Sequence, residues 1–334
     1  MYETFFRLSG IPFQLTPDSR FFFGSAGHSR AISHLVYGLS QEEGFIVITG
    51  EVGAGKTTLV EHLWTRLDRA SYAVGRVVTT LVSGDDLLRL AVTSFGIADD
   101  GTDKATLLRR FEAMVRAQRQ AGRRCLLVID EAQNLSVATL EELRMLSNIT
   151  VDGRASVQTI LLGQPQFRPL LARPELEQLR QRVLASYHLG PLTEAETRQY
   201  IEHRLRLVGW ADDPHWHDDA FARVFAATRG IPRRVNTLCG RLLLFAALDE
   251  THDITAAMVE ATAAELEQDL GAGAPTAVAT PAAPGAAEPI DRRLSAIEDR
   301  LGRQDRLLRR VVDLLDTLAE APEDRPRARA APPS

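Results

Sequence analysis

The residues "FIVITGEVGAGKTTLVEHL", 45–63, say most about how this chain can fold. An apolar run comes first, a glycine-rich turn follows, and a helical pattern completes the stretch. Gly50, Gly55, Lys56 and Thr57 have the spacing G-x-x-x-x-G-K-[ST] between that strand and that helix. Glycines let such a turn point its N–H groups inward at a helix N-terminus, where phosphate is favoured. The stretch therefore predicts a phosphate-binding loop.

This loop also predicts a nucleotide and Mg²⁺ as ligands. We expect Lys56 to reach the terminal phosphates and the Thr57 hydroxyl to ligate the metal ion. The residues expected around the phosphates are Gly50, Glu51, Val52, Gly53, Ala54, Gly55, Lys56, Thr57 and Thr58. A glycine-rich turn without a ligand is the alternative, and the strand and helix that flank this turn argue against it.

A second motif, "CLLVIDEAQNL" at 125–135, places two adjacent carboxylates at the end of an apolar strand. The metal side of a phosphoryl-transfer site requires such a group. We expect Asp130 to hold Mg²⁺, through water, and Glu131 to orient and deprotonate the attacking water. An acidic helix cap is the alternative.

The composition is that of a globular protein. Of 334 residues, 45% are hydrophobic and 25% are charged, and the net charge of -5 argues against bulk electrostatic binding of nucleic acid. Cys125 and Cys239 give no disulfide framework or zinc pattern. No apolar stretch reaches the ~20 residues of a transmembrane helix, and "MYETFFRLSGIPF" is not a secretory signal. We therefore expect a cytoplasmic protein.

The order of patterns predicts an α/β core followed by a smaller helical unit. Continuous apolar runs indicate strands that are covered on both faces, and they lie at 45–49, 73–78, 125–129, 157–162 and 183–189. Residues 1–190 are therefore expected to form a core around a mainly parallel sheet. From Thr193 the period becomes 3.6. This predicts a helical domain over 191–270, with helices at 193–208, 217–228, 232–249 and 254–269.

The composition changes after residue 270. Residues 271–289 are an Ala/Pro/Gly linker with almost no charge, which we expect to be disordered. Residues 290–320 carry apolar side chains at alternating steps of four and three, which predicts a short coiled coil. A single amphipathic helix docked on the core is the alternative. Residues 321–334 are expected to form a disordered tail.

The phosphate-binding loop, the "DEAQ" motif and the trailing helices together resemble the AAA+ ATPases, over roughly residues 1–270. The resemblance implies a P-loop NTPase fold with a five-stranded parallel sheet, a C-terminal helical lid and the hydrolysis of ATP. In "TILLGQP", it implies that Gln164 senses the γ-phosphate. In "LEQLRQRVLASYHLGPL", Arg182, with Arg180 in reserve, would reach into a neighbouring subunit's site. In "RGIPRRVNTLC", Arg233 would reach from the lid to the γ-phosphate.

Each of these three assignments has a simpler alternative: a turn residue, a surface arginine and a solvated basic helix end.

The opening "MYETFFRLSGIPFQLTPDSRFFFGSAGHSRAISHLVYGL" narrows the resemblance to the general secretion pathway protein A (ExeA-like) ATPases. The segments "LEELRMLSNIT" and "LLGQPQFRPLL" are most similar to the secretion ATPase of exosortase (PEP-CTERM) loci. By this resemblance His28 lies near the adenine, and a packing or capping role is equally open. The secretion-type relatives continue into a transmembrane helix and a periplasmic domain, whereas this chain ends in a linker and heptads, so direct action on the cell wall is not expected.

The resemblance implies an ATPase that hydrolyses ATP with Mg²⁺ at a subunit interface and supports an exosortase-linked envelope or exopolysaccharide export system. Its expected partners are further copies of itself and proteins of that system, with the chain in the cytoplasm or peripheral at the inner membrane. Two alternatives stay open. One is a nucleotide-dependent switch or scaffold with negligible turnover. The other is a DNA-linked ATPase similar to transposition regulators, which the acidic net charge disfavours.

Overall fold

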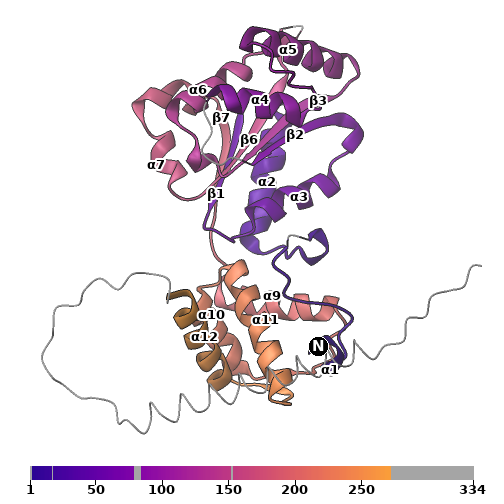
Figure 1. The fold of residues 1–334 in the computed structure, drawn as a ribbon, viewed down its shortest axis with the longest axis vertical. Helices are drawn as coiled ribbons and strands as arrows, with labels where there is room; N and C mark the ends of the chain where they lie inside the picture. The colour runs from indigo at the N-terminus through magenta and orange to yellow at the C-terminus, as the bar shows by residue number, and fades with distance from the viewer. Residues whose placement is uncertain (1, 17, 79–83, 152, 272–334) are drawn as a thin grey trace, which may run out of the picture.

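A five-stranded parallel sheet forms the upper part of the molecule in Figure 1. The structure is a computed structural model that describes residues 2–16, 18–78, 84–151 and 153–271. The strands lie in the order β2 (Tyr72–Val78), β3 (Arg124–Asp130), β6 (Val157–Gly163), β1 (Phe45–Gly50) and β7 (Val183–Leu189). All four pairings are parallel. The predicted α/β sheet is confirmed, and each strand begins and ends within one residue of its expected bounds.

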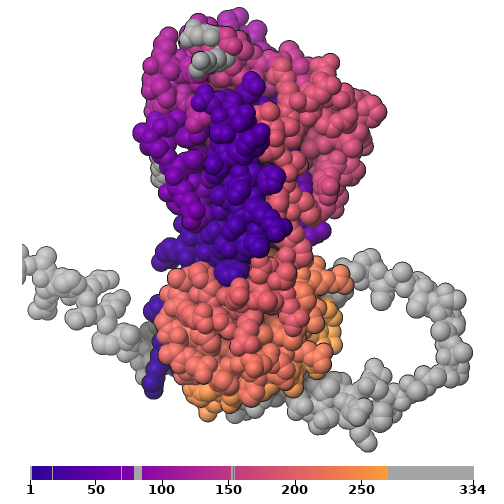
Figure 2. All heavy atoms as spheres, turned by 180° about the vertical axis from the view of Figure 1, so that it is seen from behind, coloured from indigo at the N-terminus to yellow at the C-terminus, as the bar shows by residue number. Residues whose placement is uncertain are grey.

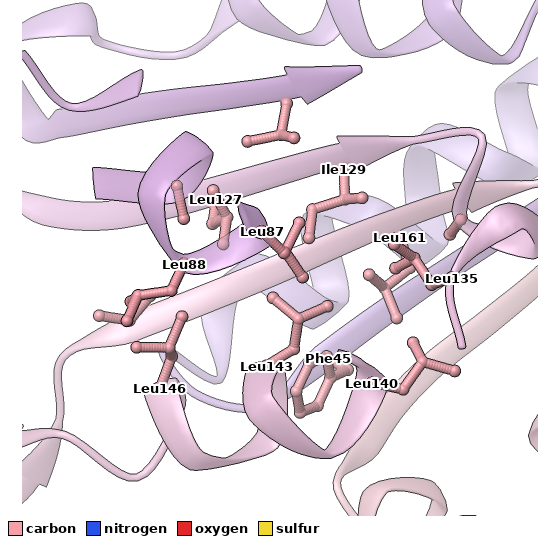
Figure 3. Packing of buried hydrophobic residues seen from close by; sticks show 14 of the residues in the cluster. Phe45, Leu87, Leu88, Leu127, Ile129, Leu135, Leu140, Leu143, Leu146 and Leu161 are labelled. Atoms are coloured by element: carbon pink, nitrogen blue, oxygen red, sulfur yellow. The ribbon is translucent and has the colours of Figure 1, made fainter. Parts of the chain in front are cut away.

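The sheet is covered on both faces because successive side chains of a strand point to opposite sides. Phe45 and Val47 of β1 belong to one buried cluster, whereas Ile46 and Ile48 belong to another. The first cluster, part of which Figure 3 shows, lies under α4 (Gly84–Ser94), α5 (Lys104–Gln120) and α6 (Val137–Leu146). The second lies under α2 (Ala26–Ser40) and α3 (Lys56–Arg66). This double burial explains why β1 is a continuous apolar run.

Short elements complete the first 190 residues. They are α1 (Tyr2–Phe5), η1 (Ser19–Phe21), η2 (Arg69–Ser71), η3 (Ala132–Asn134), β4 (Thr150–Val151), β5 (Arg154–Ala155), α7 (Phe167–Leu171), η4 (Pro174–Leu176) and α8 (Glu177–Arg180). The first of them, α1, packs against α11 (Pro232–Leu248). Two others follow strands at the same edge of the sheet, since η3 comes after β3 and α7 comes after β6. That edge is where the candidate site lies.

A helical unit follows the sheet, as predicted (Figure 1). It consists of α9 (Glu194–Leu207), α10 (Asp218–Thr228), α11 (Pro232–Leu248) and α12 (Ala256–Gly271). Thr193 begins α9 with a reciprocal capping box to Glu196, which satisfies N–H groups that the helix leaves unpaired. The short parallel pair β8 (His215–Trp216) and β9 (Asp253–Ile254) was not predicted, because two residues are too few to show a periodicity.

The N-terminal segment packs against the helical unit. Phe6, Leu8, Phe13 and Phe21 are buried in the same cluster as the apolar faces of α9, α10 and α11. Burial of each such side chain away from water stabilises the folded state by roughly 1.5–3 kcal/mol. This packing differs from the expectation that residues 1–190 form one unit, because the opening of the chain has its apolar partners about 200 residues downstream.

Residues 272–334, which hold most of the expected linker and all of the expected coiled coil and tail, lie outside the described residues. Within the described ranges, no helix is long and apolar enough to cross a bilayer.

Candidate functional site

The loop between β1 and α3 has the backbone geometry of an anion cradle. Gly53 and Gly55 have φ angles of +81° and +97°, a left-handed conformation that costs glycine little. Gly55 is the N-cap of α3, so the unpaired N–H groups of that helix start open onto the loop. A Cβ at Gly55 would lie 2.8 Å from His28 Nε2, and one at Gly53 would lie 2.3 Å from the Cβ of Arg233. Both glycines therefore let other parts of the chain approach the loop closely.

A cleft opens between this loop and the helical unit. Its walls come from the N-terminal segment, the loop with the start of α3, the turn after β3, and helices α9 and α11. In Figure 2, the indigo N-terminal part of the chain meets the orange helical unit at the narrow middle of the molecule. A ligand in the cleft would therefore contact both units at once.

Lys56, Thr57 and Asp130 lie together beside the loop. Lys56 is 6% exposed, and its Nζ donates to the carbonyl oxygens of Gly50 at 2.8 Å and Glu51 at 3.0 Å. Thr57 Oγ1 donates to Asp130 Oδ2 at 2.8 Å, so the hydroxyl and the carboxylate expected at the metal ion are neighbours. Burial lowers the pKa of Lys56, while the nearby carboxylates of Glu131, Asp130 and Glu51 oppose that effect.

Glu131 follows β3 in a left-handed backbone conformation, with φ +54° and ψ +38°. This conformation is uncommon for a residue other than glycine. Its Oε2 accepts hydrogen bonds from Gln133 Nε2 at 2.6 Å and from Gln164 Nε2 at 3.0 Å. Burial raises the pKa of this carboxyl, but the two amides and the charges of Lys56 and Arg233 outweigh burial and hold the pKa below its ordinary value. The carboxylate is therefore ionised at neutral pH, as a proton acceptor must be.

Arg233 lies in the first turn of α11 and lines the cleft. Pro232 begins that helix, where its missing N–H costs nothing. The Arg233 N–H donates to the carbonyl oxygen of Gly53 at 3.2 Å. The start of α11 thus touches the phosphate-binding loop directly, which brings the expected lid residue to the site.

Arg182 lies at the other end of the sheet. It directly precedes β7, and its carbonyl accepts from the N–H of Phe45, the first residue of β1. The phosphate-binding loop follows Gly50, the last residue of β1, which is roughly 20 Å away at ~3.3 Å per strand residue. Arg182 is exposed, and its guanidinium donates to Ser147 Oγ at 3.3 Å. It cannot reach the cleft of its own chain.

Arg180, the reserve candidate, is engaged locally. Its guanidinium pairs with Glu177 and donates to the carbonyl oxygen of Ala172 at 3.3 Å.

His28 is buried in the first turn of α2, between the N-cap Ser25 and the phosphate-binding loop. Its Nδ1 lies 2.8 Å from Ser25 Oγ, and its ring has a backbone hydrogen bond with Ala54. Burial lowers the pKa of His28 to about 4, against a smaller opposing contribution from that hydrogen bond and from Glu196. The ring both packs against the loop and lines the cleft, so the two alternatives left open by the sequence coexist.

Several residues at or beside the cleft were not predicted from the sequence. Gln14, Tyr200, Arg204 and Asn236 line its far wall, whereas Gln133 lies outside the lining and donates to Glu131. Arg204 is 6% exposed and donates to the carbonyl oxygens of Pro12 at 3.0 Å and Gln14 at 3.3 Å. Their neighbours are distant in the sequence, so periodicity and motif spacing carry no signal for them. The "Q" of "DEAQ" was the one available sign for Gln133.

The residues present fit a nucleotide with Mg²⁺. Gly53 and Gly55 give the loop its left-handed turns at the N-terminus of α3, and the buried ammonium of Lys56 lies beside it. Thr57 and Asp130 offer the hard oxygen ligands that Mg²⁺ prefers, and they are already in contact.

Comparison with known proteins agrees with this geometry. Residues 39–171 match the family model of the AAA domain. Over 258 residues, which are 76% of this chain, the sequence is 34% identical to the General secretion pathway protein A of Aeromonas hydrophila. The chain spans only 46% of the length of that relative.

Solved structures with the same fold are more distant in sequence. The Cdc6p structure from Pyrobaculum aerophilum has a TM-score of 0.60 at 16% identity, and the match covers 82% of this chain and 74% of that one. The ADP form of the Aeropyrum pernix ORC2 protein has a TM-score of 0.58 at 19% identity, with 81% and 74% covered. These likenesses show the AAA-type P-loop NTPase fold. The AAA domain and the 34% identity together support an AAA+ ATPase of the general secretion pathway protein A type.

Proposed function

We propose that this chain, through its AAA domain, binds ATP with Mg²⁺ in the cleft and hydrolyses the bond between the β- and γ-phosphates. One observation carries the proposal. An ionised Glu131 lines the same cleft as the buried Lys56 and as Thr57, whose hydroxyl contacts Asp130. These groups supply anion binding, metal ligation and proton acceptance in one place.

In this proposal each residue has a distinct task. The loop N–H groups and Lys56 bind the β- and γ-phosphates, and Thr57 with Asp130 would hold Mg²⁺, which offsets charge on the phosphate oxygens. Glu131 orients the attacking water and accepts its proton at a carboxylate oxygen. Gln164 fixes that carboxylate, and Arg233 brings a positive charge from α11 to the terminal phosphate.

Binding and chemistry can be separated by two substitutions. Lys56→Ala should weaken ATP binding by about 100-fold or more, because it removes a buried charge-assisted contact. Glu131→Gln should bind ATP normally and lose about 10²- to 10⁴-fold in turnover, since an amide cannot accept the proton. Equilibrium binding of a fluorescent ATP analogue and single-turnover phosphate release measure the two quantities. Normal hydrolysis by Glu131→Gln would remove the general-base assignment.

We further propose that the ATPase serves an exosortase-linked envelope or exopolysaccharide export system, in the cytoplasm or peripheral at the inner membrane. The 34% identity to a General secretion pathway protein A supports a role in secretion, and the sequence segments quoted above support the exosortase branch. Cells whose only copy carries Glu131→Gln should accumulate unexported polysaccharide or unsecreted protein, measured by fractionation. Export at the normal rate would separate the ATPase from this pathway.

A further inference from the structure

The side chain of Gln133 bridges two turns that meet at the proposed catalytic edge of the sheet. Its Nε2 donates to Glu131 Oε2 at 2.6 Å, and its Oε1 accepts from the backbone N–H of Gln164 at 2.9 Å. The side chain of Gln164 also donates to this carboxylate, from its Nε2 to Glu131 Oε2 at 3.0 Å. The three side chains therefore form a closed ring of hydrogen bonds.

Chemistry fixes the orientation of the Gln133 amide within this ring. A backbone N–H can only donate, and an ionised carboxylate can only accept. The Gln133 oxygen must therefore face Gln164, and its nitrogen must face Glu131. A flipped amide would break both contacts, so the ring has one arrangement.

The elements around the ring are rigid. Gln133 lies in η3 after β3, and Gln164 follows β6, the strand next to β3 in the sheet. Gly163 ends β6, and a Cβ there would lie 2.9 Å from the Cβ of the fully buried Phe167. The Gln164 carbonyl also accepts from the Phe167 N–H at 2.9 Å. Gln133 thus ties the Glu131 carboxylate to a turn that tertiary packing already holds in place.

We propose that Gln133 is a positioning residue for the hydrolysis proposed above: it sets the direction of the Glu131 carboxylate by linking it to the turn that carries Gln164. The inference rests on the proposed function, since it assigns how the proton acceptor is aimed. A misplacement of about 1 Å in a catalytic group can cost ~10²-fold in rate. Gln133 does not line the cleft, so it should affect the chemical step and leave ATP binding unchanged.

The test replaces the amide while keeping its shape. Gln133→Met has a similar length and neither hydrogen bond, and we expect its kcat to fall about 10- to 100-fold while KM and the Kd for ATP stay within about 3-fold. Gln120→Met makes the same chemical change at an exposed position on α5 and should leave all three quantities unchanged. A normal kcat in Gln133→Met, or a loss confined to Kd, would overturn the proposal.

A second variant covers the case in which Gln133→Met does not fold. Gln133→Glu keeps an acceptor for the Gln164 N–H and replaces the donor to Glu131 with a carboxylate oxygen. Its kcat should fall at least as far as that of Gln133→Met, at unchanged Kd. Full activity in Gln133→Glu would contradict a role for the donated bond.

A double variant shows whether Gln133 acts through Glu131. In the Glu131→Gln background, Gln133→Met should cause little further loss, because the group that it aims is already gone. A full additional 10- to 100-fold loss would mean that Gln133 acts elsewhere. The two proposals fail differently. Turnover that does not depend on Glu131 defeats the proposed function, whereas Glu131-dependent turnover with an active Gln133→Met defeats only this inference.

Discussion

Neutral groups donate or accept the hydrogen bonds described above for two charged side chains of the cleft, Lys56 and Glu131. Two backbone carbonyls hold the Lys56 ammonium, and two side-chain amides hold the Glu131 carboxylate. A neutral hydrogen-bond partner fixes a charged group without cancelling its charge. The ammonium can therefore still attract a phosphate, and the carboxylate can still take a proton.

His28 differs from these residues because burial keeps its ring neutral. The folded chain holds the pKa of His28 at about 4, whereas the unfolded chain takes up the proton near 6.5. Between these two values the unfolded state binds more protons, so stability falls as the pH falls through that window. Protonation of this one group can lower the free energy of unfolding by at most about 3 kcal/mol.

We therefore predict that His28→Gln, which does not titrate, loses less stability between pH 7 and pH 5 than the wild type does. Urea unfolding at several pH values measures this, and the other histidines cancel in the comparison. Parallel pH profiles for the two proteins would show that His28 takes no part in the linkage.

At the scale of elements, a direct contact between the two units joins the phosphate-binding loop to the start of α11. The Gly53 carbonyl accepts from the Arg233 N–H, and no room exists for a side chain at Gly53. The angle of α11 is therefore coupled to the conformation of the loop that would hold the phosphates.

Gly53→Ala should break this coupling. A matched control exists in Gly122→Ala, because Gly122 also has a left-handed φ, of +74°, but has nothing within 4 Å of its would-be Cβ. Gly122→Ala should lower the free energy of unfolding by about 1–2 kcal/mol, from backbone strain alone, and leave ATP affinity unchanged. Gly53→Ala should cost more stability than the control and weaken ATP binding at least 10-fold. Equal effects of the two substitutions on stability and affinity would show that the Arg233 contact is unimportant.

The predictability of each element follows from where its partners lie. The strands could be placed within one residue because β1 and β6 are buried on both faces, which leaves a continuous apolar run in the sequence. The loop was predictable because its chemistry is local. The position of Phe6 and Phe13 was not, since their partners are the distant helices of the second unit. Gln133 was missed for the same reason, because its contact with Gln164 depends on β3 and β6 being neighbours.

At the scale of the whole molecule, the N-terminal segment joins the two units around the cleft. The Arg204 guanidinium lies 4.9 Å from the ring centre of Phe21 and 5.2 Å from that of Tyr200, while it donates to the carbonyls of Pro12 and Gln14. Asn236 of α11 donates to the same Gln14 carbonyl at 3.3 Å. The segment therefore follows the helical unit, and movement of that unit would carry one wall of the cleft with it.

Arg182 is the residue through which a second copy of the chain would contribute to the site. Its position at the start of β7 puts it beyond reach of its own cleft, so any role in hydrolysis requires the cleft of another chain. The resemblance to the AAA+ ATPases implies that Arg182 reaches into a neighbouring subunit's site, and we propose that its guanidinium there offsets charge on the transferring phosphoryl group, an effect worth about 10³- to 10⁵-fold where such arginines act. Arg182→Ala should therefore bind ATP normally and lose most turnover, whereas Arg116→Ala, at an exposed site on α5, should not.

The most direct test measures phosphate release by mixed oligomers. Glu131→Gln and Arg182→Ala chains, each expected to be inactive alone, are expressed together with different affinity tags and purified through both. We predict recovered activity, because a cleft with an intact Glu131 can then face an intact Arg182 from the other chain. A mixture of Glu131→Gln with Lys56→Ala should stay inactive, since no cleft in it is complete. Mixed oligomers of the first kind without activity, or full activity of Arg182→Ala alone, would contradict a shared site.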